Sequence, residues 1–325
     1  MPSPHLLTLQ SHLNTLLPSR PALRDSILPT LLHTISSIAA SLRTSSHVSQ
    51  IGTANAFGDA QLNVDVLAET IIRTAINDCP RIVTASSEED PVERGVNPIP
   101  ETDDGEIYTL AFDPLDGSSI IAPNWAVGTI MGLWDGRTAL GPDPGATLVA
   151  GILGVQGPRT TAFVAIRLPG CEGTCFEVGY DGDEMVVVRA NVSLRQGGLG
   201  GTRYFAPANL RAAASHPAYM SLVSRFITDS YTLRYSGGLV PDIVHSLVKG
   251  HGIYISPVTA TSTAKLRRLY ELTPVALVVE CCGGAAVDED GQRVLGRRVE
   301  ATGERGGLVC GNREEVEFVK GVLLG

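Results

Sequence analysis

The chain has 325 residues, of which 43% are hydrophobic and 18% are charged, and its formal net charge is −9. These totals are typical of a folded globular protein with one large domain or two packed lobes. The negative charge disfavours nucleic acid or an anionic membrane as a partner, and no secretory signal or membrane-length apolar run is visible. We therefore expect a cytoplasmic protein with neither nucleic acid nor membrane as its partner.

Residues 1–43 are predicted to form helices. Leucines recur at helical spacing up to Pro18, and a second apolar stripe runs from Leu28 to Leu42. Amphipathic helices of this kind most often pack on a core. A targeting or membrane role is the alternative, although the first helix carries almost no positive charge.

Two acidic residues lie around the start of the next predicted helix. Gly58 and Asp59 end a loop, and an apolar stripe that begins at Val64 predicts a helix with Asp65 near its start. In a purely structural interpretation, Asp59 or Asn63 caps the helix and Asp65 complements its dipole. A functional role for the two aspartates is the alternative.

A short predicted strand, Arg81–Ala85, runs into three consecutive acidic residues, Glu88, Glu89 and Asp90. Such a run most often marks a solvated loop. A metal site would use the same residues, because hard cations prefer carboxylate oxygens.

The most informative stretch is Asp113-Pro114-Leu115-Asp116-Gly117-Ser118-Ser119. It follows an alternating strand pattern at residues 107–112, so a strand should end on two carboxylates. Pro114 fixes φ, and we expect the chain to turn there. Gly117 and the two hydroxyls after it could hold an anionic oxygen. This combination suits Mg²⁺ facing a phosphate; the alternative is an acidic surface turn.

Residues 128–165 are β-rich and, together with a hairpin about Asp181-Gly182, they predict a mostly antiparallel sheet. A glycine-rich stretch at 196–202 marks a boundary. We therefore expect an N-terminal lobe over residues 1–196 and a C-terminal α/β lobe over residues 197–325.

In the C-terminal lobe, Thr273-Pro274 is predicted to open a helix that ends at Gly283. Glu280 is the only charged residue of this helix, where an unpaired carboxylate is costly. A buried basic partner, Lys265 or Arg267, is the structural interpretation. We favour a metal ion, which would offset the cost better.

Together these segments resemble the sugar bisphosphatases, the family of fructose-1,6-bisphosphatase and sedoheptulose-1,7-bisphosphatase. The resemblance runs from about residue 30 to the C-terminus. It rests on short motifs in the same order, among them Phe57-Gly58-Asp59, Ser87-Glu88-Glu89, Phe112–Ser119 and Lys265-Leu266-Arg267. The stretch Tyr231–Asp242 favours the sedoheptulose branch. The resemblance implies an α/β (α+β) fold with α-β-α-β-α layers and two packed lobes.

The resemblance also implies the site residues. Two or three Mg²⁺ ions, with Mn²⁺ as an alternative, would be held by Asp59, Glu88, Asp113, the carbonyl of Leu115, Asp116 and Glu280. Asp65 and Glu89 would deprotonate the attacking water. The 1-phosphate and the sugar would be held by Asp116, Gly117, Ser118, Ser119, Lys265 and Arg267, and the distal phosphate would be read by Arg234 and Tyr235. Hydrolysis of a phosphate monoester needs groups of these kinds.

Some positions depart from the family. Val48 and Thr53 stand where the plastid sedoheptulose enzymes carry a redox cysteine pair, and Ile107-Tyr108 replaces a Lys-Tyr pair that the fructose enzymes use for AMP. We therefore expect neither thiol control nor AMP inhibition of those kinds.

The expected function is that of a Mg²⁺-dependent sugar-bisphosphate 1-phosphatase, a phosphoric monoester hydrolase. Sedoheptulose 1,7-bisphosphate is the first choice of substrate; fructose 1,6-bisphosphate, or dual specificity, is the alternative. A non-catalytic sugar-phosphate sensor is the second alternative, but none of the implied carboxylates is missing. We also expect a homo-oligomer, either a dimer or a tetramer.

Overall fold

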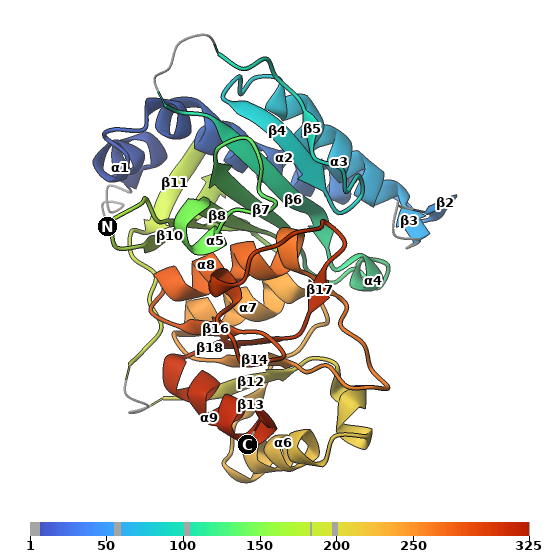
Figure 1. Ribbon diagram of the computed structural model, residues 1–325. Helices are drawn as coiled ribbons and strands as arrows, with labels where there is room; N and C mark the ends of the chain where they lie inside the picture. The colour runs from blue at the N-terminus through green and yellow to red at the C-terminus, as the bar shows by residue number, and fades with distance from the viewer. Residues whose placement is uncertain (1–6, 55–59, 101–104, 183, 197–200, 325) are drawn as a thin grey trace, which may run out of the picture.

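The computed structural model describes residues 7–54, 60–100, 105–182, 184–196 and 201–324. Its elements stack in layers of helices, sheet, helices, sheet and helices, as Figure 1 shows from top to bottom. This arrangement confirms the layered α/β fold expected from the sequence. The predicted lobe boundary near residue 197 falls beside residues outside the described part and stays a prediction.

Among the described residues, the first sheet has nine strands and is antiparallel except where β4 pairs with β6. This confirms the mostly antiparallel sheet expected from residue 128 onward. In sheet order the strands are β1 (Leu7–Thr8), β11 (Glu184–Arg189), β10 (Thr174–Asp181), β9 (Thr160–Ile166), β8 (Leu148–Gln156), β7 (Val127–Asp135), β6 (Tyr108–Asp116), β4 (Ile82–Ser87) and β5 (Arg94–Gly95).

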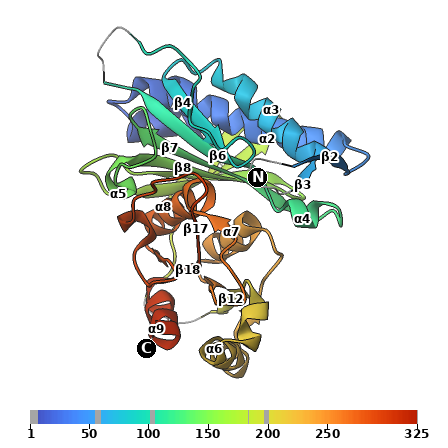
Figure 2. The same ribbon diagram turned by 45° about the vertical axis from the view of Figure 1, so that its right-hand side comes forward.

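The first helical layer covers one face of this sheet (Figure 2). It comprises α1 (Leu9–Leu16), the π-helical turn η1 (Leu23–Ile27), α2 (Leu28–Thr44) and α3 (Asn63–Ile76), so the helices predicted before residue 44 are confirmed from residue 9 onward. Their apolar stripes bury Leu13, Leu31 and Ile72 against the sheet. Tyr108, Leu110 and Phe112 of β6 belong to the same core, so the residues between them face the other side of the sheet.

The middle layer contains α7 (Leu239–Lys249) and a longer helical run, in which the π-helical turn η3 (Arg268–Leu272) leads into α8 (Thr273–Cys281). Glycines let these helices approach the sheet closely. A Cβ on Gly128 would lie 2.3 Å from Cβ of Val240 on α7, and one on Gly151 would lie 3.0 Å from the carbonyl oxygen of Pro274. The helical layer therefore sits directly on β7 and β8.

The second sheet, in the order β13-β12-β14-β18-β16, has α6 and α9 on its far side (Figure 1). Its strands are β12 (Tyr204–Pro207), β13 (Thr232–Leu233), β14 (Ile253–Ser256), β16 (Ala285–Val287) and β18 (Leu308–Gly311), and the outer helices are α6 (Pro217–Thr228) and α9 (Arg313–Leu324). The remaining elements are short: β2 (Gln50–Ala54), β3 (Ala60–Leu62), α4 (Ser118–Ile121), α5 (Pro144–Thr147), η2 (Leu210–Ala214), β15 (Leu266–Arg267), η4 (Val294–Gly296) and β17 (Arg305–Gly306). None of the helices among the described residues is long and apolar enough to cross a membrane.

Candidate active site

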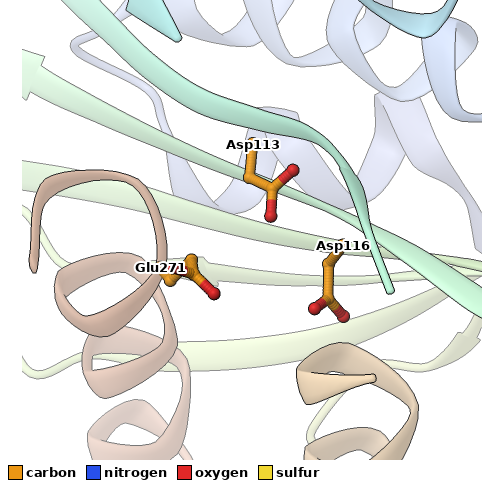
Figure 3. A group of neighbouring side chains, drawn as sticks. All are labelled: Asp113, Asp116 and Glu271. Carbon is orange, nitrogen blue, oxygen red and sulfur yellow. The ribbon is translucent and has the colours of Figure 1, made fainter. Parts of the chain in front are cut away.

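Three buried carboxylates meet between the first sheet and the middle helical layer. Asp113 and Asp116 project from β6, and Glu271 projects from η3 (Figure 3). They are 3%, 7% and 7% exposed, and each offers an oxygen within 4.8 Å of the other two. We call Asp113, Asp116 and Glu271 the acidic cluster.

The local shape of β6 brings the two aspartates together. Residues three apart in a regular strand face opposite sides of a sheet, but the register between β6 and β7 shifts between Asp113 and Asp116. This irregularity also accommodates Pro114, which has no donor for the ladder. The strand therefore ends on the second carboxylate, Asp116, and the turn expected at Pro114 is wrong, because β6 passes through Pro114 with a bulge.

Asp116 joins the sheet to the middle helical layer. Its Oδ1 accepts a hydrogen bond from the backbone N–H of Leu239 at 3.0 Å, and its Oδ2 accepts one from Val240 at 2.7 Å. Leu239 and Val240 are the first two residues of α7. The N-cap residue of this helix, Gly238, has no side chain that could accept hydrogen bonds from them, so Asp116 takes over the capping. Burial raises the pKa of Asp116 to about 6 against the opposing effect of these two bonds.

The acidic cluster has the properties of a cation site. Burial, followed by the nearby charge of Glu88, raises the pKa of Asp113 and of Glu271 well above their usual values. Three carboxylates so close together are costly unless a positive charge compensates them. Because all the donors are oxygens, the set fits a hard divalent cation such as Mg²⁺.

The sequence does not single out Glu271 as a site residue, because Thr273-Pro274 predicts a helix start two residues after it. The helical conformation instead begins at Arg268 and passes through Thr273, whose hydroxyl donates to the carbonyls of Arg268 and Leu269. The signal was nevertheless present. Glu271 is a single carboxylate in an apolar run, which is the same argument that was applied to Glu280.

Glu280 lies at the other end of α8 and is not part of the acidic cluster. Arg293 donates from Nε to its Oε1 at 2.8 Å and from Nη2 to its Oε2 at 2.6 Å. Arg167 donates to the same Oε2 from Nη1 at 2.8 Å. Burial alone would raise the pKa of Glu280, but the bonds from Arg293 and Arg167 outweigh it and leave the pKa lowered. The expectation that Glu280 is a metal ligand is therefore corrected: two arginines, and neither Lys265 nor Arg267, compensate its charge.

Asp65 occupies the first turn of α3 and is 4% exposed. Its Oδ2 accepts a hydrogen bond from the N–H of Leu62 at 2.9 Å, whereas its buried Oδ1 has no hydrogen-bond partner among the described residues. Burial raises the pKa of Asp65 to about 7, and the charges of Glu89 and Glu88 add to the rise. Asp65 thus lies in the first turn, where it complements the helix dipole as the structural interpretation expects, but it also bonds back to the N-cap residue Leu62, a capping role which that interpretation gives to Asp59 or Asn63. Its other oxygen is kept for another partner.

Glu88 and Glu89 follow β4, which runs parallel to β6. The N–H of Glu88 donates to the carbonyl of Phe112 at 3.0 Å, which fixes it beside the acidic cluster. Its Oε1 accepts from Nε of Arg267 at 2.8 Å, and Glu89 accepts from the side chain of Gln61. Asp59, the remaining carboxylate expected at the site, lies outside the described residues.

The residues expected to bind substrate fall into three groups. Gly117, with φ of 95°, precedes Ser118 and Ser119, which are exposed at the start of α4. Lys265 is exposed. Arg267 is only 1% exposed, and its backbone N–H donates to Oε2 of Glu271 at 2.5 Å.

Arg234 and Tyr235 form the third group and are both exposed. They lead into a turn in which Asp242 accepts a hydrogen bond from the N–H of Ser236 at 2.7 Å. The turn continues to Leu239, the first residue of α7, whose N–H donates to Asp116. Leu115 is buried between the two aspartates, and its N–H donates to Oδ1 of Asp113 at 3.0 Å.

Comparison with known proteins identifies relatives that match most of the chain. The model of the fructose-1-6-bisphosphatase N-terminal domain matches residues 18–182, and the model of the C-terminal domain matches residues 200–323. Chloroplastic sedoheptulose-1,7-bisphosphatase of Chlamydomonas reinhardtii is 38% identical over 89% of this chain and 70% of its own length. A class 1 fructose-1,6-bisphosphatase of Trichlorobacter lovleyi is 32% identical, over 83% of this chain and 82% of its own. The holo crystal structure of Leishmania major fructose-1,6-bisphosphatase, 24% identical, matches with a TM-score of 0.85 over 98% of this chain and 99% of that one, a likeness of fold.

Proposed function

The chain belongs to the fructose-1,6-bisphosphatase family, and from this membership and the geometry of the site we propose that it removes the 1-phosphate of sedoheptulose 1,7-bisphosphate with the help of Mg²⁺. The family is metal-dependent and hydrolyses phosphoric monoesters, so the protein is a phosphatase. The observation that carries the proposal is the acidic cluster, three buried carboxylates next to the Gly117-Ser118-Ser119 turn.

We propose that the acidic cluster holds the metal, together with Glu88 and the carbonyl of Leu115. Two or three Mg²⁺ ions, or Mn²⁺ in their place, would compensate the buried charges, and Asp59 stays a predicted further ligand. Glu271 takes the place that the sequence had assigned to Glu280. When bound, such ions neutralise phosphate charge and make water a better nucleophile.

Asp65 and Glu89 are the proposed proton acceptors. The Oδ1 of Asp65 is buried and without a partner among the described residues, so it can accept the proton of an attacking water. A pKa of about 7 suits a group that exchanges protons near neutral pH. Glu89 lies close enough to raise that pKa and would share the proton.

For the substrate, the N–H groups and hydroxyls of the 117–119 turn are the proposed 1-phosphate ligands, with Lys265 over the sugar. Because Arg267 is buried against Glu88, its proposed role shifts to positioning Glu88 and Glu271. Arg234 and Tyr235 remain the proposed readers of the distal phosphate, since their exposed side chains lie on the segment that leads to α7.

Fructose 1,6-bisphosphate is the second candidate substrate, favoured by the class 1 relatives at 32% to 34% identity. The test is kcat/KM for both bisphosphates with Mg²⁺. A ratio strongly favouring sedoheptulose 1,7-bisphosphate supports the first choice, and comparable values support dual specificity. If the protein binds either bisphosphate but hydrolyses neither, the result supports the alternative of a non-catalytic sugar-phosphate sensor.

Assembly and compartment stay proposals as well. A dimer or tetramer is expected, and light scattering on the purified protein would test it. The expected cytoplasmic location needs a direct test by cell fractionation, because the relatives from Chlamydomonas reinhardtii, Triticum aestivum and Spinacia oleracea are named chloroplastic.

A further inference from the structure

A pocket lies at the C-terminal end of α8, away from the acidic cluster at the other end of the helical run. Its volume is about 440 Å³, and its charged lining residues are Arg167, Glu280, Arg293, Arg313, Glu317 and Lys320. We call this the basic pocket. Glu280 lies nine residues beyond Glu271 on one helical run, which corresponds to about 14 Å along the axis. The basic pocket is thus separate from the proposed active site.

The basic pocket carries more positive than negative charge. Four cationic side chains and two carboxylates line it, a formal balance of +2, in a chain whose net charge is −9. Such a concentration of positive charge within an acidic molecule attracts anions to one place.

The two carboxylates do not use all the donors of the basic pocket. Glu280 is 13% exposed and is shared by Arg167 and Arg293. Nη2 of Arg167 is buried and has no hydrogen-bond partner within the described part of the chain. A buried guanidinium donor without an acceptor is costly. Because Arg167 lines the pocket, a shift of its side chain toward a bound ligand would give Nη2 an acceptor.

Across the pocket, α9 contributes Arg313 and Lys320. Nη2 of Arg313 donates to the carbonyl of Gly284 at 3.1 Å, which anchors the side chain without neutralising it. Among the residues that the structure describes, neither Arg313 nor Lys320 forms an ion pair with a carboxylate. Their charges are therefore available to a ligand.

The same arginines also face a neighbouring pocket. Arg167 and Arg293 line a second space of about 380 Å³ beside α5 and the loop Leu168–Cys171, and that space has no acidic lining residue. An anion can therefore contact the pair from either side. Guanidinium groups present several N–H donors in one plane, a geometry that matches phosphate oxygens.

We propose that the basic pocket binds a small organic phosphate as a site distinct from the active site. The ligand's phosphate would contact Arg313 and Lys320 and accept from Arg167, while Glu280 keeps the two inner arginines in place. The remainder of the ligand would lie against the small residues Gly284 and Ala285, which also line the pocket.

Inorganic pyrophosphate is a suitable probe, measured by calorimetry in EDTA. Without a divalent cation the acidic cluster repels an anion, which weakens binding at the proposed active site. The variants described below assign the remaining binding to the basic pocket. We expect saturable binding of one pyrophosphate per chain, and the double variant Arg313→Ala/Lys320→Ala should raise Kd at least tenfold. The control Arg43→Ala, which removes an exposed arginine in the last turn of α2 on the other face of the first sheet, should change Kd less than twofold.

A second comparison separates charge from folding. The variant Arg313→Lys/Lys320→Arg keeps both charges, so it should retain Kd within about threefold of the wild type, with the same melting temperature. The proposal is overturned if wild-type protein binds pyrophosphate only when Mg²⁺ is present, or if the double alanine variant binds as tightly as wild type. Turnover of a sugar bisphosphate is measured separately, so failure here would not affect the proposed function.

Discussion

Replacing Glu271 and Glu280 by Gln, one at a time, tests the assignment of the metal site most directly. Both residues lie on the same helical run, and both substitutions remove one charge with almost no change in size. Glu271→Gln removes one negative charge from the acidic cluster. Glu280→Gln takes a carboxylate from between two arginines. The two variants are therefore matched controls for each other.

The structure gives opposite expectations for the two variants. Glu271→Gln should lower Mg²⁺-dependent kcat/KM at least 100-fold, about 2.7 kcal/mol of transition-state stabilisation. Without metal it should be more stable than wild type by about 1 to 3 kcal/mol, because one of three mutually repelling buried charges is gone. Glu280→Gln should keep kcat/KM within about twofold. Its free energy of unfolding should fall by about 1 to 3 kcal/mol, and the half-exposed position of Arg293 limits this loss because solvent screens the unpaired charge.

The assay combines steady-state phosphate release over a Mg²⁺ titration with urea unfolding in EDTA at pH 8. A large loss of activity in Glu280→Gln with native stability would refute the assignment, and so would near-normal activity in Glu271→Gln. A loss of activity in both variants at unchanged stability would mean that the helical run acts as a unit in catalysis, and the separation of the two ends argued above would be wrong.

Three further outcomes are expected. Glu89→Gln should abolish turnover while leaving fold and substrate binding largely intact, and normal turnover of this variant would remove Glu89 from its proposed role. In EDTA, the unfolding free energy should fall as pH rises from about 4 to 7. In the folded state the pKa values of Asp116 and Asp65, about 6 and about 7, lie above their ordinary values, so the folded state binds more protons than the unfolded state over this range. Melting curves across this range should show the decrease, and the same curves recorded in saturating Mg²⁺ without EDTA should show a smaller pH dependence. Gly128→Ala should cost about 1 to 3 kcal/mol, since its Cβ would lie 2.3 Å from that of Val240; calorimetric melting at or above the wild-type temperature would show that the close contact can relax.

Much of the fold could be predicted because its elements carry their own periodicity. The helices before residue 44, the alternation that aims Asp113 away from Tyr108 and Leu110, and the hairpin at Asp181-Gly182 follow from local patterns. The bulge in β6 could not be predicted this way. It depends on how β7 pairs with β6 around Pro114, and that pairing is a property of the sheet.

The site was partly predictable for a related reason. Asp113, Asp116, Asp65 and Glu88 could be selected because turns and helix starts have local signatures. Glu271 and Glu280, by contrast, are equivalent as sequence: each is a lone carboxylate among apolar neighbours. What distinguishes them is the partner that the fold supplies, two arginines for Glu280 and two aspartates for Glu271. Arg293 lies 13 residues from Glu280, but Arg167 and the two aspartates come from segments more than a hundred residues away from their partners.

The hydrogen bonds that Asp116 accepts from the first turn of α7 affect where inactivating mutations would be found. A genetic screen for loss of activity should return changes on α7 and on β7 beneath it, as well as changes of the acidic residues themselves. A substitution that tilts the start of α7 withdraws the N–H groups of Leu239 and Val240 and leaves the Asp116 carboxylate free to rotate. Such alleles should be suppressible by a second change that lets α7 settle back on the sheet, whereas loss of the carboxylate itself should have no suppressor there.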